Sequence, residues 1–281
     1  MTDKELVLTD DPRPRVRRIT LNRPEKRNAM SNDLRNRLFD ALRDADLDDD
    51  VSVIVIRGAG KCWSAGYDLA QDHSQPLSRH SNRRNGHWPR HLVDGWIDVW
   101  DYDTPVIGQV HGYCLAGGTE LAMACDLVYV ADDAVIGYPP VRDISPPDMC
   151  WQPWIYGLRR GMEAVLTGDS VSGKEAVELG FANRSFPLDE LEDGVLAVAE
   201  RVAKVPPDIL ALNKRSVHRA MDIMGIRTSL RVTTDSQTIG GMLPSVQERK
   251  QAFRAGVTSA LQDRDAAFGD YRTKDDAPNG S

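Results

Sequence analysis

The stretch "CLAGGTELAMACD", at residues 114–126, places two adjacent glycines and a carboxylate at the expected start of an apolar helix. The first amides of a helix lack intrahelical partners, and the helix dipole favours negative charge there. Gly117 and Gly118 would let such amides approach a ligand, although they could equally serve close helix packing. Glu120 in the first turn could act as a general base, or could be an acid favoured by the dipole alone.

A second glycine-rich corner, "SAGYDL" at residues 64–69, follows another expected strand. If both corners face one pocket, one backbone N–H from each could hold a single oxygen atom. Such a pair of donors stabilises an oxyanion, either the enolate of a thioester or a tetrahedral intermediate. The two corners together therefore indicate acyl chemistry at a polarised carbonyl.

Alternating strands and helices must position these corners. β-Branched or apolar runs predict strands at 6–8, 16–21, 51–58, 104–112 and 126–131. Ser31 can cap a helix that runs to about Ala45, and another helix is expected near residues 92–100. This alternation predicts an α/β fold.

The domain organisation changes in the second half of the chain. From Leu188 onward the pattern is mostly helical, with a break at "VPPDIL", residues 205–210. We predict a core at residues 1–205 that carries the site, a helical region at residues 206–272 and a disordered tail at residues 273–281.

Composition excludes several classes of protein. The 281 residues carry a net charge of -7, so the basic face typical of nucleic-acid binding is not expected. No apolar run reaches the roughly 20 residues of a membrane span, and the first residues resemble no signal peptide. The four cysteines form no CxxC pair, which favours reduced thiols. The sequence predicts a cytoplasmic protein with no nucleic-acid or membrane partner.

Two further motifs are weak. "GDSVSGKE", residues 168–175, matches a phosphate-binding loop until Glu175 replaces the magnesium-binding Ser or Thr, so a turn between helices is preferred. Residues 71–91 hold four of the six histidines and four arginines, but in no familiar ligand spacing. We expect no metal site and interpret this segment as a polar surface loop, or alternatively as a cationic lid over an anionic ligand.

The chain resembles the crotonase, or enoyl-CoA hydratase/isomerase, superfamily. The motifs that carry this resemblance span nearly the whole chain in the right order. The resemblance implies a spiral core of ββα units and a helical C-terminal region that assembles trimers or hexamers. It also implies a coenzyme A thioester as substrate and no separate cofactor. The matching stretches are "ITLNRPEKRNAM", "SAGYDL", "GYCLAGGTELAMACDLVYVADDAVIG", "LTGDSVSGKEAVELGFANRSFP" and "QAFRAGVTSALQDRDAAF".

The resemblance also implies roles for individual residues. It assigns the oxyanion donors to the backbone N–H groups of Tyr67 and Gly117, and the first catalytic glutamate to Glu120. The Tyr67 ring would then be free to line the acyl pocket or to pack in the core. Further contacts to the substrate or to coenzyme A are expected from Arg27, Ala65, Gly66, Asp68, Leu69, Gly118 and Pro140.

The sequence departs from the hydratase pattern at one position. Two-glutamate hydratases carry their second glutamate where this chain has Pro140, which cannot move a proton. Asp148, eight residues later, matches an aspartate that some family members require. Asp148 is therefore a candidate second acid, although it could equally be a helix cap, and Asp143 is a weaker candidate because Arg142 could pair with it.

Hydration of a 2-enoyl-CoA is the activity that the sequence favours. A double-bond isomerase, or a lyase or hydrolase that uses Glu120 with Asp148, is the alternative within the family. A non-catalytic protein that binds acyl-CoA is the alternative from another class.

Overall fold

The computed structural model describes residues 5–70 and 93–269, apart from the side chains of Lys250 and Arg254. Within these ranges, six strands form one sheet in the order β1-β2-β3-β4-β6-β9, and three short strands form a second in the order β5-β7-β8. The pairs β1–β2 and β7–β8 are antiparallel, and the other strand pairs are parallel. The strands are β1 Val7–Arg13, β2 Val16–Leu21, β3 Val53–Gly58, β4 Val106–Val110, β5 Tyr113–Leu115, β6 Leu127–Ala131, β7 Val135–Gly137, β8 Val171–Ser172 and β9 Arg184–Phe186.

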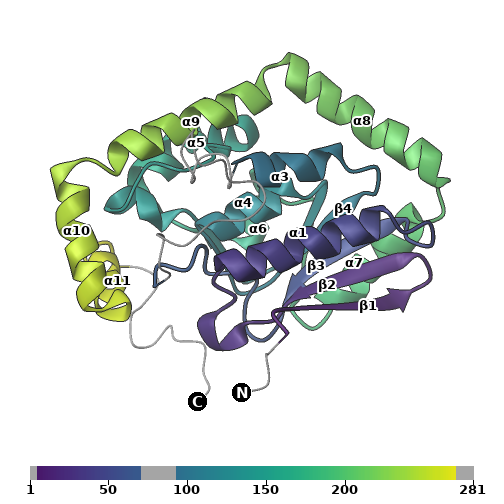
Figure 1. Cartoon of the computed structure of the whole chain (residues 1–281), viewed down its shortest axis with the longest axis horizontal. Helices are drawn as coiled ribbons and strands as arrows, with labels where there is room; N and C mark the ends of the chain where they lie inside the picture. Colours follow the sequence, from purple (N-terminus) through teal and green to yellow (C-terminus); the bar gives the residue numbers. More distant parts are fainter. Residues whose placement is uncertain (1–4, 71–92, 270–281) are drawn as a thin grey trace.

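Helices pack around these sheets and extend beyond them. Figure 1 shows α1, α3 and α4 close to the strands, and α8 and α9 along one edge of the molecule with α10 and α11 beyond. The α-helices are α1 Asn32–Asp46, α3 Gly95–Asp98, α4 Gly117–Ala124, α5 Gln152–Thr167, α6 Gly173–Glu178, α7 Leu191–Val202, α8 Pro207–Ile223, α9 Ile226–Gly240, α10 Pro244–Ala255 and α11 Val257–Ala266, and the 3₁₀ helices are η1 Pro24–Lys26, η3 Val99–Asp101 and η4 Pro139–Arg142.

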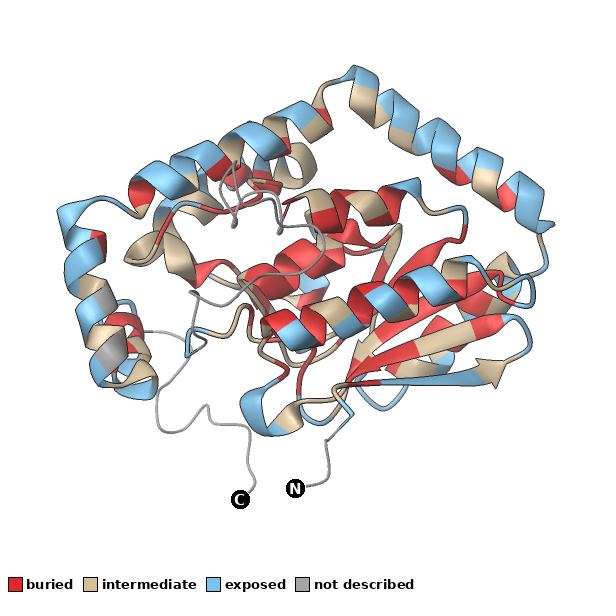
Figure 2. Ribbon diagram, viewed as in Figure 1, coloured by how far each residue is buried: buried red, intermediate tan, exposed pale blue. Residues whose placement is uncertain are grey.

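The core follows from the apolar pattern of the sequence. β3 and β4 are buried almost throughout, because both faces of the sheet are covered (Figure 2). α1 begins where the sequence predicts, since the Ser31 hydroxyl accepts a hydrogen bond from the Leu34 amide. Leu34, Leu38 and Leu42 recur at a helical spacing and are fully buried. The helix and the two strands thus form one continuous core.

The N-terminal hairpin corrects one expectation. The sequence predicted a strand at 6–8 only, whereas β1 continues to Arg13. A shift of register between Asp10 and Arg13 accommodates Pro12, which cannot donate a hydrogen bond within a regular ladder. Because β1 is an edge strand, the interruption leaves the central strands intact.

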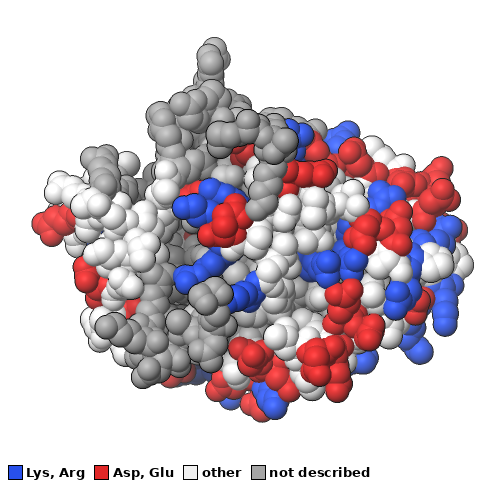
Figure 3. All heavy atoms as spheres, turned by 90° about the horizontal axis from the view of Figure 1, so that it is seen from below, with Lys and Arg blue, Asp and Glu red and all other residues white. Residues whose placement is uncertain are grey.

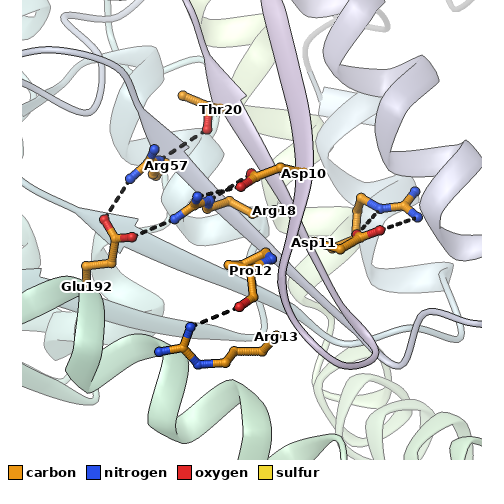
Figure 4. Close-up of polar contacts among 9 residues, drawn as sticks. Asp10, Asp11, Pro12, Arg13, Arg18, Thr20, Arg57 and Glu192 are labelled. Carbon is orange, nitrogen blue, oxygen red and sulfur yellow. Dashed lines mark hydrogen bonds and ion pairs between the residues drawn. The ribbon is translucent and has the colours of Figure 1, made fainter.

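Ion pairs join this hairpin to α7. Arg18 on β2 contacts both Asp10 on β1 and Glu192 on α7, and Arg57 on β3 reaches the second carboxylate oxygen of Glu192 at 2.7 Å (Figure 4). These contacts tie α7 to the sheet, together with the buried Val195 and Leu196. α7 therefore packs with the strands.

The rest of the described chain is consistent with a helical C-terminal region from α8 onward. The predicted boundary near residue 205 falls in the short link between α7 and α8, but independence of the two regions stays a prediction. The predicted tail at 273–281 lies outside the described residues. "GDSVSGKE" begins at Gly168, which caps the end of α5, and contains β8 and the start of α6, where Ser172 and Glu175 make a reciprocal helix cap.

The surface charges are of both signs, and the described helices are short or polar. Lys and Arg side chains are interspersed with Asp and Glu over the described part of the face seen in Figure 3. Among the described helices, none combines the length and the apolar character needed to cross a membrane.

Candidate active site

The turn before α4 aims the first residues of that helix inward. Ala116 adopts φ 51° and ψ -124°, a conformation that is strained for a residue with a side chain. Its amide donates to the carbonyl of Gly137, and its carbonyl accepts from the Thr119 hydroxyl at 2.7 Å. These bonds fix the start of α4. As a result the Glu120 side chain is completely buried, with 0% of its surface exposed.

The two glycine-rich corners lie against each other. Ser64 pairs with Cys114 in a parallel bridge, and the Leu115 amide donates to the Ser64 carbonyl at 3.0 Å. A Cβ placed on Gly66 would lie 2.8 Å from the Cβ of Ala116 and 3.2 Å from the amide nitrogen of Gly117. The first corner therefore approaches the start of α4 as closely as glycine permits.

Two tyrosine hydroxyls converge on Glu120. Tyr67 donates a short hydrogen bond to Oε2, and Tyr138 donates to Oε1 at 3.0 Å. The backbone amide of Met149 also donates to Oε1, at 3.3 Å. A Cβ on Gly117 would lie 2.5 Å from the Tyr67 ring, so glycine is required for this phenol to lie across the start of α4. All three of these hydrogen bonds to the Glu120 carboxylate come from neutral donors.

A second carboxylate shares this network. The Tyr138 hydroxyl lies 3.3 Å from Oδ2 of Asp148 and accepts the Asp148 backbone amide at the same distance. Burial raises the pKa of Glu120 to about 8, and repulsion from Asp148 adds to this effect, whereas the three donors oppose it. Burial also raises the pKa of Tyr67 and Tyr138 well above 10. Glu120 therefore exchanges its proton near neutral pH, as a general base must.

A buried cation borders the two carboxylates. Arg35 on α1 is 1% exposed, and its guanidinium carbon lies 5.1 Å from the centroid of the Tyr67 ring. Burial lowers the pKa of Arg35, while its electrostatic interactions with Tyr67, Asp148 and Glu120 oppose that shift. Trp96 on α3 donates its indole N–H to the Tyr67 hydroxyl at 3.0 Å. The site is therefore a buried cluster of two acids, two phenols and one cation.

The comparison with known families agrees with this arrangement. Residues 13–270 match the model of the enoyl-CoA hydratase/isomerase family. The chain belongs to that family. The crotonase-type α/β fold that the sequence predicted is thereby confirmed, since solved members of the family superimpose on most of the chain.

Solved structures and a curated relative also support the membership of this chain in the enoyl-CoA hydratase/isomerase family, and the two structures cover nearly its full length. An enoyl-CoA hydratase from Mycobacterium smegmatis is 30% identical, with a TM-score of 0.85 over 95% of this chain and 96% of that one. An enoyl-CoA hydratase/isomerase from Xanthobacter autotrophicus Py2 is 30% identical, with a TM-score of 0.84 over 96% and 99% of the chains. The hydroxycinnamoyl-CoA hydratase-lyase of Pseudomonas fluorescens is 31% identical over 73% of this chain and 75% of that protein.

Several residues that the family resemblance selected surround the first corner. The carbonyl of Arg27 accepts the Ala65 amide at 3.0 Å, and Arg27 itself adopts a positive φ of 52°. Gly66 needs its φ of 98°, and a Cβ on Gly118 would meet the Ser64 carbonyl at 2.7 Å. These four residues therefore shape the corner, while their contact with a ligand stays a prediction.

The remaining predicted contacts differ in their surroundings. The Asp68 carboxylate is paired with Arg23 at 2.6 Å, and Leu69 is partly exposed. Pro140 lies in η4, where its carbonyl accepts the amides of Ile144 and Ser145. Pro140 therefore holds the turn that carries the segment towards Asp148.

The alternative acid candidates separate clearly. Asp148 lies in the same network as Glu120, whereas Asp143 pairs with Arg249 on α10 at 2.5 Å. Arg142 pairs with Asp169 at 2.8 Å. The 71–91 segment, interpreted as a loop or lid, lies outside the described residues.

Sequence reasoning missed four side chains of this site. Tyr67 was assigned a backbone role, with its ring free to line the acyl pocket or to pack in the core, yet its phenol contacts Glu120. Tyr138, Trp96 and Arg35 were not singled out at all. Tyr138 stands two residues before Pro140, so the missing second glutamate should have drawn attention to its neighbours. Arg35 carried a signal as well, because it falls on the buried face of α1 between Leu34 and Leu38.

Proposed function

We propose that this protein hydrates a 2-enoyl-CoA thioester. One observation carries the proposal: a completely buried glutamate, with its pKa raised to about 8, lies one helical turn from the glycine corner that begins α4. Membership of the enoyl-CoA hydratase/isomerase family supports it independently. The proposed chemistry uses the protein's own groups, and coenzyme A enters only as part of the substrate.

Each group then has a defined task. The backbone N–H groups of Tyr67 and Gly117 hold the thioester oxygen and stabilise the negative charge that develops on it. Glu120 takes a proton from water, whose oxygen forms a bond to C3. The electron pair of the C2–C3 double bond moves towards the thioester oxygen and then returns to C2, which takes a proton from Asp148. The product is a 3-hydroxyacyl-CoA.

A double-bond isomerase is the second candidate. It is supported by Asp148, which is linked to Glu120 by the Tyr138 hydroxyl. The replacement of the second glutamate by Pro140 also favours it. In that reaction Glu120 would remove a proton from C2 and Asp148 would return one to C4. A lyase reaction is supported more weakly, by the similarity to the hydroxycinnamoyl-CoA hydratase-lyase.

Turnover of crotonyl-CoA tests the first candidate. Loss of the conjugated-thioester absorbance is expected with the wild-type protein, and Glu120→Gln should lower kcat by about 10²–10⁴-fold because the general base is lost. Glu163→Gln, on the exposed side of α5, is a matched control that should leave the rate unchanged. Tight binding of crotonyl-CoA without turnover of any enoyl-CoA would instead identify a binding protein.

Self-association as a trimer or hexamer is a further part of the proposal. It is supported by large apolar side chains that are exposed on α5, α8 and α9, since such surface is usually covered by a partner. The exposed side chains include Leu158, Met162, Leu166, Leu212, Val217, Ile223, Val232 and Ile239. Light scattering coupled to gel filtration would measure the mass of the assembly.

A cytoplasmic location stays a prediction from the sequence.

A further inference from the structure

Tyr138 lies between the two carboxylates of the site. Its hydroxyl donates to Oε1 of Glu120 at 3.0 Å and lies 3.3 Å from Oδ2 of Asp148. The Asp148 backbone amide donates to the same hydroxyl at 3.3 Å and fixes its position. Glu120 is 0% exposed, and Asp148 and Tyr138 are each 4% exposed. The three groups therefore exchange protons with one another more readily than with bulk water.

The Tyr138 hydroxyl can form hydrogen bonds with both carboxyl groups only if it donates to one and accepts from the other. A phenol carries one proton, so it donates to one carboxylate at a time. The contact to the other carboxyl becomes a hydrogen bond when that group carries a proton and donates it to the phenol oxygen. One proton on the pair of carboxyls therefore satisfies both contacts. Arg35, buried beside Tyr67, balances the one remaining negative charge.

We propose that Tyr138 passes a proton from Glu120 to Asp148 after each turnover and so returns the site to its starting state. This inference rests on the proposed function, because turnover leaves Glu120 protonated and Asp148 ionised. In the reset, the O–H bond of Glu120 breaks as its proton joins the Tyr138 oxygen, and the Tyr138 O–H bond breaks as its proton joins Oδ2 of Asp148. The phenol ends with one proton, as it began.

Tyr67 contacts the same carboxylate but has a different neighbour. Its hydroxyl receives the indole N–H of Trp96 at 3.0 Å, and an indole nitrogen is a donor only. That contact orients Tyr67 and carries no proton onward. Tyr67 is therefore a positioning residue for Glu120, whereas Tyr138 connects Glu120 to a second acid.

A rapid-quench experiment with Tyr138→Phe tests the reset. Enzyme is mixed with crotonyl-CoA, and the substrate is in several-fold excess over active sites. Product is measured during the first and the later turnovers. In the variant the first turnover should slow only about 10-fold, from the lost hydrogen bond to Glu120, whereas later turnovers should slow by roughly a further hundredfold because the reset is blocked. The burst should approach one product per active site.

Tyr129→Phe is the matched control. Tyr129 is a buried tyrosine on β6 whose ring packs against Phe186, so its variant should show wild-type rates in both phases. Thermal unfolding shows whether each variant folds. If Tyr138→Phe does not fold, 3-fluorotyrosine at position 138 keeps the hydroxyl and makes it more acidic, and it should change the later turnovers but not the first.

Two results would overturn the inference. One is an equal slowing of the first and later turnovers in Tyr138→Phe, which would make Tyr138 a positioning residue. The other is a wild-type rate in both phases, or no effect of the fluorinated residue on the later turnovers. A wild-type protein that converts no enoyl-CoA would instead refute the proposed function, so the two failures are distinguishable.

Discussion

The two ends of α4 hold two carboxylates in opposite surroundings, Glu120 completely buried and Asp126 with 14% of its side chain exposed. Glu120 in the first turn is bound by two phenols and a backbone amide, with Asp148 beyond one phenol. Asp126, just after the last turn, is bound by cationic or potentially cationic groups instead. Lys214 lies 3.0 Å from its Oδ2, and Nε2 of His218 lies 2.7 Å from its Oδ1.

The difference separates a reactive carboxylate from a structural one. Lys214 also donates to the carbonyls of Val99 and Thr104, and the Asp126 carboxylate accepts the Val106 amide, so this cluster fastens α8 to the core. At the other end, neutral donors leave the carboxylate free to gain and lose a proton. A largely buried acid paired with a cation fixes structure, whereas a buried acid beside a second acid suits proton transfer.

The largest effect that sharpens this comparison is expected at the structural end. Lys214→Met should lower the free energy of unfolding by about 3–5 kcal/mol, because Asp126, with 14% of its side chain exposed, would keep a largely buried charge without its lysine. The rate per folded molecule should change little. Urea unfolding measures the loss, and Arg215→Met, which breaks an exposed pair with Asp103, should cost about 0–1 kcal/mol. Equal losses in both variants would contradict the distinction.

A smaller effect is expected from the phenol that only positions Glu120. Tyr67→Phe removes a hydrogen bond to the carboxylate and leaves the Trp96 N–H without this acceptor. Such a bond contributes about 1.5–3 kcal/mol, so kcat/KM should fall by roughly 10- to 100-fold. The pH at which Glu120 titrates should rise as well, because the lost donor stabilised the ionised form. Steady-state rates across pH would detect both changes, and an unaltered pH profile would exclude a role through Glu120.

The smallest change separates the two acids by pH. Asp148 must carry a proton to deliver to C2 while Glu120 is ionised, so the pair of carboxyls needs one proton. The value of kcat/KM should therefore fall as pH rises above about 8, where Glu120 ionises beside an ionised Asp148. Repulsion from Asp148 contributes to that raised pKa, hence Asp148→Asn should lower the pKa of Glu120 and remove this basic limb while lowering the maximum rate. A basic limb that stays in place would contradict the sharing of one proton, and Asp143→Asn, whose carboxylate faces Arg249, is the control.

Much of the fold could be predicted from the sequence because local patterns determined it. The buried strands β3, β4 and β6, the Ser31 cap of α1 and the helical nature of the C-terminal region followed from apolar spacing and capping residues. The continuation of β1 past Pro12 did not, because it depends on pairing with β2 rather than on the local apolar pattern. The family motifs likewise pointed to Glu120 and to both glycine corners before any coordinates.

The sequence by itself determined which residues could do the chemistry: Glu120 at a helix start, two glycine corners and an aspartate at position 148. Only the tertiary structure decided which partners surround them. Tyr67 and Tyr138 are 53 and 18 residues from Glu120, and their hydroxyls meet it only after the strands and α4 pack together. Burial and the nearness of Asp148 then raise the pKa of Glu120, and both depend on three-dimensional distance, which the order of residues along the chain does not express.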